Sequence, residues 1–560
     1  MSAFVRPSLS ASLWLALASG LCPVAASSMS DAPDRPKLVI LITVDQLRGD
    51  MLTRFEDRFE GGFKTLLDEG TLYTSAHYPY ATTFTAVGHA TLATGSFPID
   101  HGIVGNNWWN IESGTEMYCV QDAHHGQSPA NLTTTTLGDE LMLATGGAAR
   151  SFSISVKDRA AILPGGYYGK AFWYQRDGQF GWSTYYGADL PQWLQDFNAR
   201  DIASDCVGES WELLRPVESY VFKSQDDRPY ESGDRLGKTF PHPLGSSKSE
   251  VHALVKYTPY GDVLLAELAK ALIEAEKLGQ KDGTDFLAIS FSASDYVGHT
   301  FGPNSLEAED NLLRLDRTIG GLLTFLDESV GRDQILIALS ADHGVDAIPA
   351  HRIAAREGHP PHIDLEVSAC DDPCTMAGRI VGEELMRQAN EYLKQQFQID
   401  RELIIAFKDP GFYLDPKKTG ELDVAVIERL LADWALSKHS IARAFTRTDL
   451  LMGNVPSDPV ATRVVGSFHP ERSANVTIVQ RSGWYLWEGA GGIYAAMHGS
   501  PYNYDTHVPI VIFGAGTPKG RSARPVTPLD IAPTLANRLG ILAPSGSSGE
   551  VLVESIPSRN

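Results

Sequence analysis

The sequence is short of positive charge. It has 47 lysines and arginines against 69 aspartates and glutamates in 560 residues, which gives a formal net charge of −22. Such a chain repels nucleic acids and anionic membrane surfaces, so the composition argues against a protein that binds a polyphosphate backbone. Any chemistry on phosphate must then depend on a local positive site, such as bound metal ions.

Long hydrophobic runs are missing after the N-terminus. The first residues carry Arg6, an apolar run that begins at Leu13, and small residues around Ala26. This pattern predicts a secretory signal peptide at residues 1–26, because the run is too short and too interrupted to span a bilayer. A lipoprotein signal ending at Cys22 is disfavoured by the bulky residue before it. We therefore expect a periplasmic or secreted protein with no stable membrane insertion.

Cysteines are also few. The chain has five, of which four remain after the signal peptide: Cys119, Cys206, Cys370 and Cys374. An even number in an oxidising compartment favours disulfides over a zinc-thiolate site. We expect Cys370 to pair with Cys374, which is close in sequence, and Cys119 to pair with Cys206 by elimination.

Length and composition are those of a large globular enzyme. Hydrophobic residues make up 43% and charged residues 21% of the chain, and there are no internal repeats or low-complexity tracts. We expect one catalytic domain at residues 37–540 and a C-terminal tail at 541–560. Two insertions are expected in the domain, a cap at about 110–250 and a helix-rich peripheral segment at about 375–480.

Three buried strands end in metal-binding residue types. Residues 37–44, 286–291 and 334–339 are apolar runs, typical of parallel strands buried on both faces. The residues that follow these strands are, in order, Asp45; Asp295 and His299; Asp342 and His343. Since open α/β sheets bind ligands at the carboxyl ends of their strands, these side chains should share one edge. The pattern predicts an α/β fold with a central, mostly parallel sheet flanked by helices.

A loop crowded with hydroxyl groups lies at residues 80–95. In it, Thr85 precedes residues 90–94, which are typical of a short helix. A helix N-terminus offers free backbone N–H groups and a positive dipole end, which suit a phosphate. Thr85 is therefore the candidate nucleophile, with Thr82 and Thr83 as alternatives. Taken alone, such a loop is more often a polar surface turn, and it is the other motifs of the chain that favour the nucleophile.

A second candidate for phosphate binding follows the alternating strand at residues 151–156. Lys157 and Arg159 are two residues apart, so on an extended segment their side chains would point to the same face. Such a pair can hold a dianionic phosphoryl group, with arginine as a bidentate donor and lysine as a point charge. The alternative is a solvated charge cluster.

These segments together supply three carboxylates and three imidazoles. The third imidazole is His498 or His507, which precede an apolar strand at residues 508–513. Mixed oxygen and nitrogen ligands suit zinc, and less specifically manganese or iron. A pair of such ions acts on the attacking and leaving oxygens of an in-line displacement, so the set favours a two-metal hydrolase.

The motifs in combination resemble those of the alkaline phosphatase superfamily. They are Thr85-x-x-x-His89, Asn106, Asp295-x-x-x-His299-x-x-Gly-Pro, Asp342-His343-Gly and His498-Gly. Lys157-x-Arg159 narrows the resemblance to the single-chain bacterial alkaline phosphatases with a threonine nucleophile, the PafA-like branch. The resemblance runs from about residue 37 to about residue 540.

The resemblance implies a metal-dependent alkaline phosphatase with two zinc ions. One ion would be held by Asp295, His299 and His498, and the other by Asp45, Thr85, Asp342 and His343. Thr85 would form a phosphothreonine intermediate, whose hydrolysis releases inorganic phosphate. Asn106, Lys157 and Arg159 would hold the phosphate oxygens. His498 is preferred to His507 because the spacing from His498-Gly to the next strand resembles that of phosphodiesterase relatives.

The expected partners are small phosphorylated metabolites, such as sugar phosphates and nucleotides, with no nucleic acid. A monomer is expected, although no motif fixes the oligomeric state. The main alternative is a phosphodiesterase or nucleotide pyrophosphatase of the same superfamily, which would need an apolar pocket for the second substituent of a diester. Less favoured are a phosphoethanolamine-type transferase, which usually needs membrane helices, and a non-catalytic zinc-binding protein, which would have lost ligands.

Overall fold

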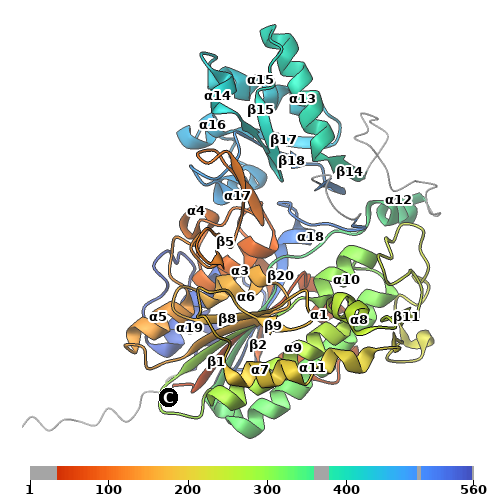
Figure 1. Cartoon of the computed structure of the whole chain (residues 1–560), viewed down its shortest axis with the longest axis vertical. Coiled ribbons are helices and arrows are strands. Elements are labelled where there is room, and N and C mark those ends of the chain that lie inside the picture. Colours follow the sequence, from red (N-terminus) through yellow and green to blue (C-terminus); the bar gives the residue numbers. More distant parts are fainter. Residues whose placement is uncertain (1–34, 358–376, 488–493, 558–560) are drawn as a thin grey trace, which may run out of the picture. The chain divides into compact units, whose positions relative to one another are not determined.

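The computed structural model describes residues 35–357, 377–487 and 494–557, which belong to one compact unit (Figure 1). Its centre is a nine-stranded sheet with the strand order β21-β2-β20-β13-β1-β12-β7-β8-β9. The strands are β1 (Leu38–Val44), β2 (Thr71–His77), β7 (Ser151–Ser155), β8 (Lys170–Tyr174), β9 (Phe180–Gly181), β12 (Asp285–Phe291), β13 (Ile335–Ser340), β20 (His507–Gly514) and β21 (Gly520–Ser522).

The middle of the sheet is parallel. Strand β1 pairs in parallel with β12 on one side and β13 on the other, with Thr43 beside both Ser290 and Ser340. Strands β7 and β8 continue the parallel order beyond β12, whereas β20 is antiparallel to both β13 and β2. The predicted α/β fold with a mostly parallel sheet is therefore confirmed, and β20 is the main exception among the long strands.

The core lies on both faces of the sheet, as the unbroken apolar strands predict. Along β1, Ile40 and Ile42 pack into the face covered by α9 (Pro259–Glu276) and α11 (Leu306–Ser329). Val39 and Leu41 point to the opposite face, which is covered by α5 (Leu137–Ala144) and α19 (Ile531–Leu539). Figure 1 shows these two layers of helices around the sheet. Because every β1 residue is buried, the strand carries no alternating pattern.

The segment at 110–250 is only partly the cap that the sequence predicts. Strands β7 and β8 belong to the central sheet, and α6 (Asp158–Gly165) connects them. The serines of β7 suggest a solvated face, but all five residues of the strand are buried. Small side chains are needed there because α5 packs closely, and a Cβ on Gly138 would overlap the hydroxyl of Ser151.

The segment at 375–480 forms a separate core. Its sheet has the order β15-β16-β18-β17, and all its pairings are antiparallel. The elements are β15 (Ile404–Lys408), β16 (Gly411–Leu414), β17 (Ile441–Thr446) and β18 (Val476–Gln480), with α13 (Gly382–Phe397) and α15 (Val424–Leu436) packed on the sheet. This segment therefore combines helices with a four-stranded antiparallel sheet.

The described cysteines correct one prediction. Cys119 is buried and Cys206 is half-buried, and both are free thiols, so the expected disulfide between them is not formed. Pairing by elimination failed because Cys119 is enclosed beside strand β4 (Thr115–Tyr118), whereas Cys206 ends a short 3-10 turn. The expected Cys370–Cys374 bond and the signal peptide lie outside the described residues.

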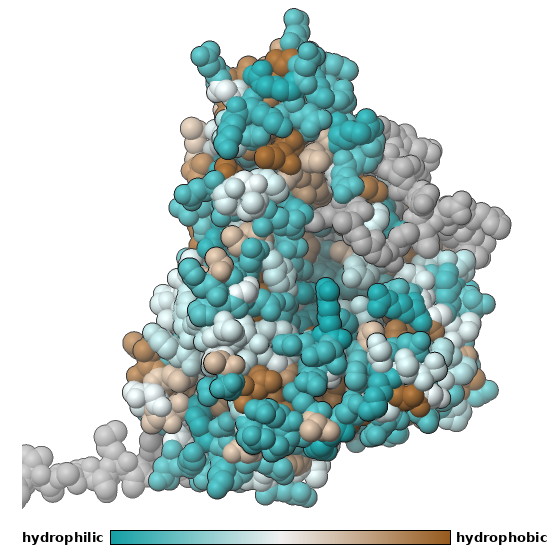
Figure 2. Space-filling model, in the orientation of Figure 1, coloured by the Kyte–Doolittle hydropathy of each residue, from teal (hydrophilic) through white to brown (hydrophobic). Residues whose placement is uncertain are grey.

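The surface is largely polar, with scattered apolar side chains on the face drawn in Figure 2. Within the described residues, none of the helices is long and apolar enough to cross a membrane. The C-terminal segment is packed rather than loose, because Leu552 is buried against the helix layer that contains α19.

Candidate active site

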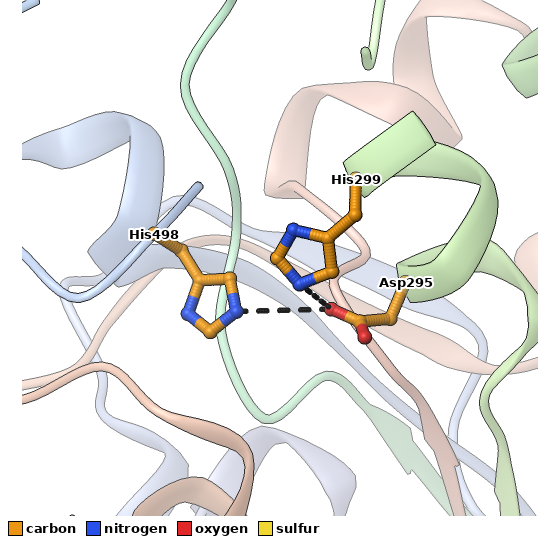
Figure 3. A group of neighbouring side chains, drawn as sticks. All are labelled: Asp295, His299 and His498. Atoms are coloured by element: carbon orange, nitrogen blue, oxygen red, sulfur yellow. Dashed lines mark ion pairs between the residues drawn. The ribbon is translucent and has the colours of Figure 1, made fainter. Parts of the chain in front are cut away.

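Two groups of three side chains meet at the carboxyl edge of the sheet. The first, here called the Asp295 group, contains Asp295, His299 and His498; the second, the Asp45 group, contains Asp45, Asp342 and His343. In each group, one potential ligand atom from every residue lies within 4.8 Å of the others. In Figure 3 both imidazoles of the Asp295 group point at one carboxylate oxygen, with Nε2 of His299 3.2 Å and Nε2 of His498 3.7 Å from Oδ1 of Asp295.

The sheet explains why residues distant in sequence meet here. Asp45 directly follows β1, and Asp342 and His343 follow its neighbour β13. Asp295 and His299 lie one turn apart on α10 (Ala293–Phe301), the helix that follows β12, so their side chains share one helix face. The parallel strands thus bring both groups to one edge, as predicted.

The remaining imidazole comes from a different direction. His498 precedes β20, and because β20 runs antiparallel to β13, the residues before it lie at the same edge. His507, the alternative, lies elsewhere: its ring stacks on His77 with centroids 4.7 Å apart, and its Nε2 is 3.0 Å from the carbonyl oxygen of Thr74. The structure therefore brings His498, not His507, into the cluster.

The imidazoles are oriented as metal ligands usually are. Nδ1 of His299 is hydrogen-bonded to the Ala496 carbonyl and Nδ1 of His498 to the Thr83 carbonyl, both at 2.7 Å. Nδ1 of His343 similarly bonds the carbonyl of Gly344 at 2.9 Å. When a backbone carbonyl holds one ring nitrogen, the other is directed towards the ligand position.

Most acceptor atoms of the Asp45 group are buried without hydrogen-bond partners. Within the described part of the chain, this holds for Oδ1 of Asp45, Oδ2 of Asp342 and Nε2 of His343, whereas Oδ2 of Asp45 is ion-paired with Nζ of Lys157. Burial, and after it the Asp342 carboxylate, raise the pKa of Asp45 well above its usual range. Buried acceptors that face one another without partners are costly unless a cation neutralises them. These atoms are therefore suitable ligands for a divalent metal ion.

Thr85 is the first residue of α3 (Thr85–Thr94) and is buried. The helix begins at the candidate nucleophile itself, earlier than the predicted residues 90–94. Its Oγ1 lies 3.4 Å from Nη2 of Arg159, and Thr85 lines a cavity at the edge of the Asp295 group. Of the alternatives, Thr83 donates its hydroxyl to the Ser500 carbonyl and Thr82 lines a separate, smaller cavity.

The two predicted cations separate. Lys157 ends the extended segment and Arg159 is already in α6, so they do not form one pair on a strand. Nζ of Lys157 lies 2.5 Å from Oδ2 of Asp295 and 2.7 Å from Oδ2 of Asp45, between the two groups. Although burial opposes its charge, these carboxylates raise the pKa of Lys157. Arg159 alone of the two lines the cavity.

Asn106 also lines the cavity. The backbone N–H of Ala86, in the first turn of α3, donates to its Oδ1 at 3.0 Å. The Nδ2 group is therefore the end of Asn106 that is available to a ligand. Tyr118 and Asp158, which sequence reasoning missed, position Arg159: the Tyr118 hydroxyl donates to Asp158 at 2.6 Å and lies 3.5 Å from Nη1 of Arg159.

The cavity has a volume of about 260 Å³ and joins these polar groups to an apolar wall. The polar part is formed by Thr85, Asn106, Asn107, Arg159, Asp409 and the Asp295 group. The wall consists of Phe84, Tyr296, Leu486, Trp487, Tyr494 and Met497. Polar groups that converge beside an apolar surface are typical of a site for small molecules.

Gln46 and His89 complete the surroundings. Gln46, which the sequence did not single out, is hydrogen-bonded to Asp342 and Asp295. His89, known only from its motif, lies with Nδ1 2.8 Å from the Thr85 carbonyl and 3.3 Å from Oδ2 of Asp342. A polar residue directly after a strand-end aspartate is the one sequence signal that Gln46 carries.

Comparison with known proteins gives matches over most of the chain. The family model of type I phosphodiesterase / nucleotide pyrophosphatase matches residues 39–501. The alkaline phosphatase PhoV of Synechococcus elongatus is 35% identical over 537 residues, which cover 93% of each chain. The alkaline phosphatase PafA of Elizabethkingia meningoseptica is 34% identical, over 94% of this chain and 96% of that protein. A solved structure of wild-type PafA superposes with a TM-score of 0.85 and 32% identity, covering 94% of this chain and all of that one.

Proposed function

The chain belongs to the PafA-like alkaline phosphatases, a family of phosphoric monoester hydrolases, and from this premise we propose that it cleaves phosphate monoesters through a phosphothreonine on Thr85. The observation that carries the proposal is the convergence of Thr85, Arg159 and the Asp295 group on one cavity. Small phosphorylated metabolites, such as sugar phosphates and nucleotides, are the proposed substrates.

Two zinc ions are the proposed cofactors. The Asp295 group would hold one, and the Asp45 group together with Oγ1 of Thr85 would hold the other. Both sets combine carboxylate and imidazole ligands, which suit zinc. Bound zinc lowers the pKa of a hydroxyl or water and stabilises negative charge on phosphate oxygens.

The residues of the chain then carry out two displacements. In the first, the Thr85 hydroxyl gives up its proton as Oγ1 forms a bond to phosphorus, the bond to the leaving oxygen breaks, and that oxygen takes up a proton and leaves as an alcohol. In the second, water gives up a proton and attacks phosphorus, the bond to Oγ1 breaks, Oγ1 regains a proton, and inorganic phosphate leaves. Thr85 begins a helix, so the backbone dipole of α3 favours the negative charge of the phosphoryl group.

Arg159 and Asn106 hold the phosphoryl oxygens during both steps. The guanidinium can donate two parallel hydrogen bonds to one phosphoryl group, and Nδ2 of Asn106 adds a third donor. Lys157 contributes positive charge beside Asp295, which lines the cavity. Such fixed charges and donors supply most of the catalysis in phosphoryl transfer.

The test is phosphate release from p-nitrophenyl phosphate by the purified protein with zinc. Thr85→Ala should lose most of the rate, whereas Thr324→Ala, at an exposed position on α11, should not change it. Acid quenching of the wild type should trap a phosphoryl group on the peptide that contains Thr85. Full activity of the Thr85→Ala variant would exclude Thr85 as the nucleophile.

A phosphodiesterase is the second candidate, because the cavity has an apolar wall on which the second substituent of a diester could rest. Hydrolysis of bis(p-nitrophenyl) phosphate separates the two. A higher kcat/KM for the diester than for the monoester, lowered by Trp487→Ala, would support this alternative.

Export to the periplasm or the exterior is part of the proposal. It is supported by the charged, apolar and small-residue pattern of residues 1–26. N-terminal sequencing of the secreted or periplasmic protein should show that the mature chain begins after Ala26. A mature chain that still begins at Met1 would contradict export through this signal.

A further inference from the structure

Gln46 occupies a tight turn directly after β1. The turn is closed by the N–H of Leu47, which donates to the carbonyl of Val44 at 3.2 Å. Gln46 is its third residue and has a φ of 69°, in the left-handed region that non-glycine residues rarely adopt. Only 5% of the residue is exposed. An uncommon backbone conformation at a buried position beside a site is an observation that points to a role for the residue.

The conformation lets Gln46 bond one carboxylate of each group. Its backbone N–H donates to Oδ1 of Asp342 at 3.0 Å, and its side-chain Nε2 donates to Oδ1 of Asp295 at 2.7 Å. The first bond fixes the Asp45 group and the second fixes the Asp295 group. Gln46 thus bonds two carboxylates, that of Asp342 after β13 and that of Asp295 on α10, while Lys157 bonds the other oxygen of Asp295.

The bond to Asp342 also selects which oxygen is available. Oδ1 of Asp342 accepts from two backbone amides, those of Gln46 and His343, both at 3.0 Å. Oδ2 is left without a hydrogen-bond partner in the described residues, and lies 3.3 Å from Nδ1 of His89 and 3.4 Å from Nε2 of His343. The amides therefore direct Oδ2 to the position where a cation would lie.

A glycine on α10 makes room for the Gln46 side chain. A Cβ on Gly298 would lie far closer than 3.0 Å to Oε1 of Gln46. Gly298 stands between Asp295 and His299 on this helix, where glycine lowers helix stability relative to alanine. A glycine is needed at position 298 because the Gln46 amide packs against the face of α10 that carries Asp295 and His299.

We propose that Gln46 is a positioning residue that couples the two cation-binding groups. Ordering of one carboxylate by a cation orders Gln46 and, through it, the carboxylate of the other group. The two cations then bind with positive cooperativity, because the second meets a carboxylate that is already oriented. This inference rests on the proposed function, since it assigns cations to the same two groups.

The test measures zinc binding separately from catalysis. Chelator-stripped protein is titrated with zinc in competition with a chromophoric chelator, and kcat and KM are then measured at saturating zinc. Gln46→Gly keeps the backbone amide and the left-handed conformation but removes the side-chain donor. We expect it to weaken zinc binding by on the order of 10-fold and to reduce the cooperativity, with a KM close to that of the wild type.

Two further variants separate positioning from a general loss of structure. Gln46→Glu has the same size but no donor, so it should not restore binding. Gly298→Ala should reproduce the defect by displacing the Gln46 side chain. Adding Gln46→Gly to Gly298→Ala should cost less than the sum of the two single changes, because the clash is then relieved.

Gln398→Gly is the matched control. Gln398 is also left-handed, with a φ of 54°, but it is exposed at the end of α13. It should leave zinc binding and turnover unchanged. Wild-type zinc affinity and cooperativity in Gln46→Gly would overturn the inference. If instead the wild type binds zinc cooperatively but does not hydrolyse monoesters, the proposed function fails while the coupling holds.

Discussion

Gly88, in the middle of α3, packs directly against the backbone of Asp342. A Cβ at Gly88 would approach the carbonyl group of Asp342 far closer than 3.0 Å. The helix that begins with Thr85 can therefore reach the end of β13 only because a hydrogen stands where a methyl group would collide. The contact fixes the distance between the candidate nucleophile and the Asp45 group.

Gly88→Ala should therefore move α3 away from Asp342. We expect a loss of about 1–3 kcal/mol in the free energy of unfolding from overpacking. Activity should fall by on the order of 100-fold, because small displacements of reacting groups are costly. Gly321→Ala on α11, where an added Cβ meets nothing within 4 Å, is the control and should be neutral or slightly stabilising. Wild-type kcat in Gly88→Ala would contradict the role of this contact.

Arg159→Ala should lower kcat/KM for p-nitrophenyl phosphate by on the order of 100-fold, because a fixed donor to the phosphoryl oxygens is lost. The loss for a diester should be smaller, since a diester carries less negative charge. Arg159→Lys should recover part of the rate, as lysine provides the charge without the bidentate geometry. Arg317→Ala, at an exposed position, serves as the control, and equal losses for both substrates would argue against recognition of a dianion.

The number of bound zinc ions should depend on the carboxylates of the two groups. We expect about two zinc ions per chain in the wild type and about one in Asp342→Asn, because the Asp45 group loses a charged ligand. Zinc should also raise the Tm of chelator-treated wild type, since binding to the folded state alone stabilises it. Asp57→Asn, at an exposed position, should bind zinc as the wild type does. Mass spectrometry of metals decides the stoichiometry, and unchanged content in Asp342→Asn would remove this residue from the site.

Glu231 should make stability fall as the pH rises. It is 1% exposed, and burial, together with the nearby Glu307, raises its pKa to about 9 in the folded protein. The unfolded state, with a pKa near 4.5, loses this proton first, so the folded state is progressively disfavoured between pH 4.5 and about 9. Above about pH 9 the destabilisation of the folded state by Glu231 is complete.

Glu231→Gln should remove this loss of stability at high pH, because glutamine does not ionise. Its Tm should exceed the wild-type Tm by roughly a few degrees at pH 9, and by less at pH 5. Glu274→Gln, at an exposed position on α9, should show no such dependence on pH. A Tm difference for Glu231→Gln that stays constant from pH 5 to pH 9 would show that the Glu231 carboxyl does not titrate in this way.

The sequence was sufficient for the parts of the fold and site that depend on local pattern. Unbroken apolar runs predicted β1, β12 and β13, and the position of parallel strand ends predicted that Asp45, Asp295 and Asp342 would meet. These inferences succeed because a central strand buried on both faces has an apolar residue at nearly every position, and this pattern can be seen in the sequence. The choice of His498 agrees with the structure, although it came from a resemblance rather than from the physics of the residues.

Other features depend on tertiary contacts that no local pattern records. The alternating strand at residues 151–156 lies within the segment predicted as a cap, and no local pattern shows that its serines are buried in the central sheet. The separation of Lys157 from Arg159 follows from a helix that begins between them. The disulfide between Cys119 and Cys206 was inferred from parity alone, which says nothing of distance. The role of Gln46 depends on a backbone angle and on space left by a distant glycine.

The reversed direction of β20 has a consequence for shortened forms of the chain. His498 reaches the carboxyl edge because β20 pairs antiparallel with β13, and β20 lies close to the C-terminal end of the chain. A chain cut before His498 would keep every residue of the Asp45 group but would lack one imidazole of the Asp295 group, so it should not complete both groups.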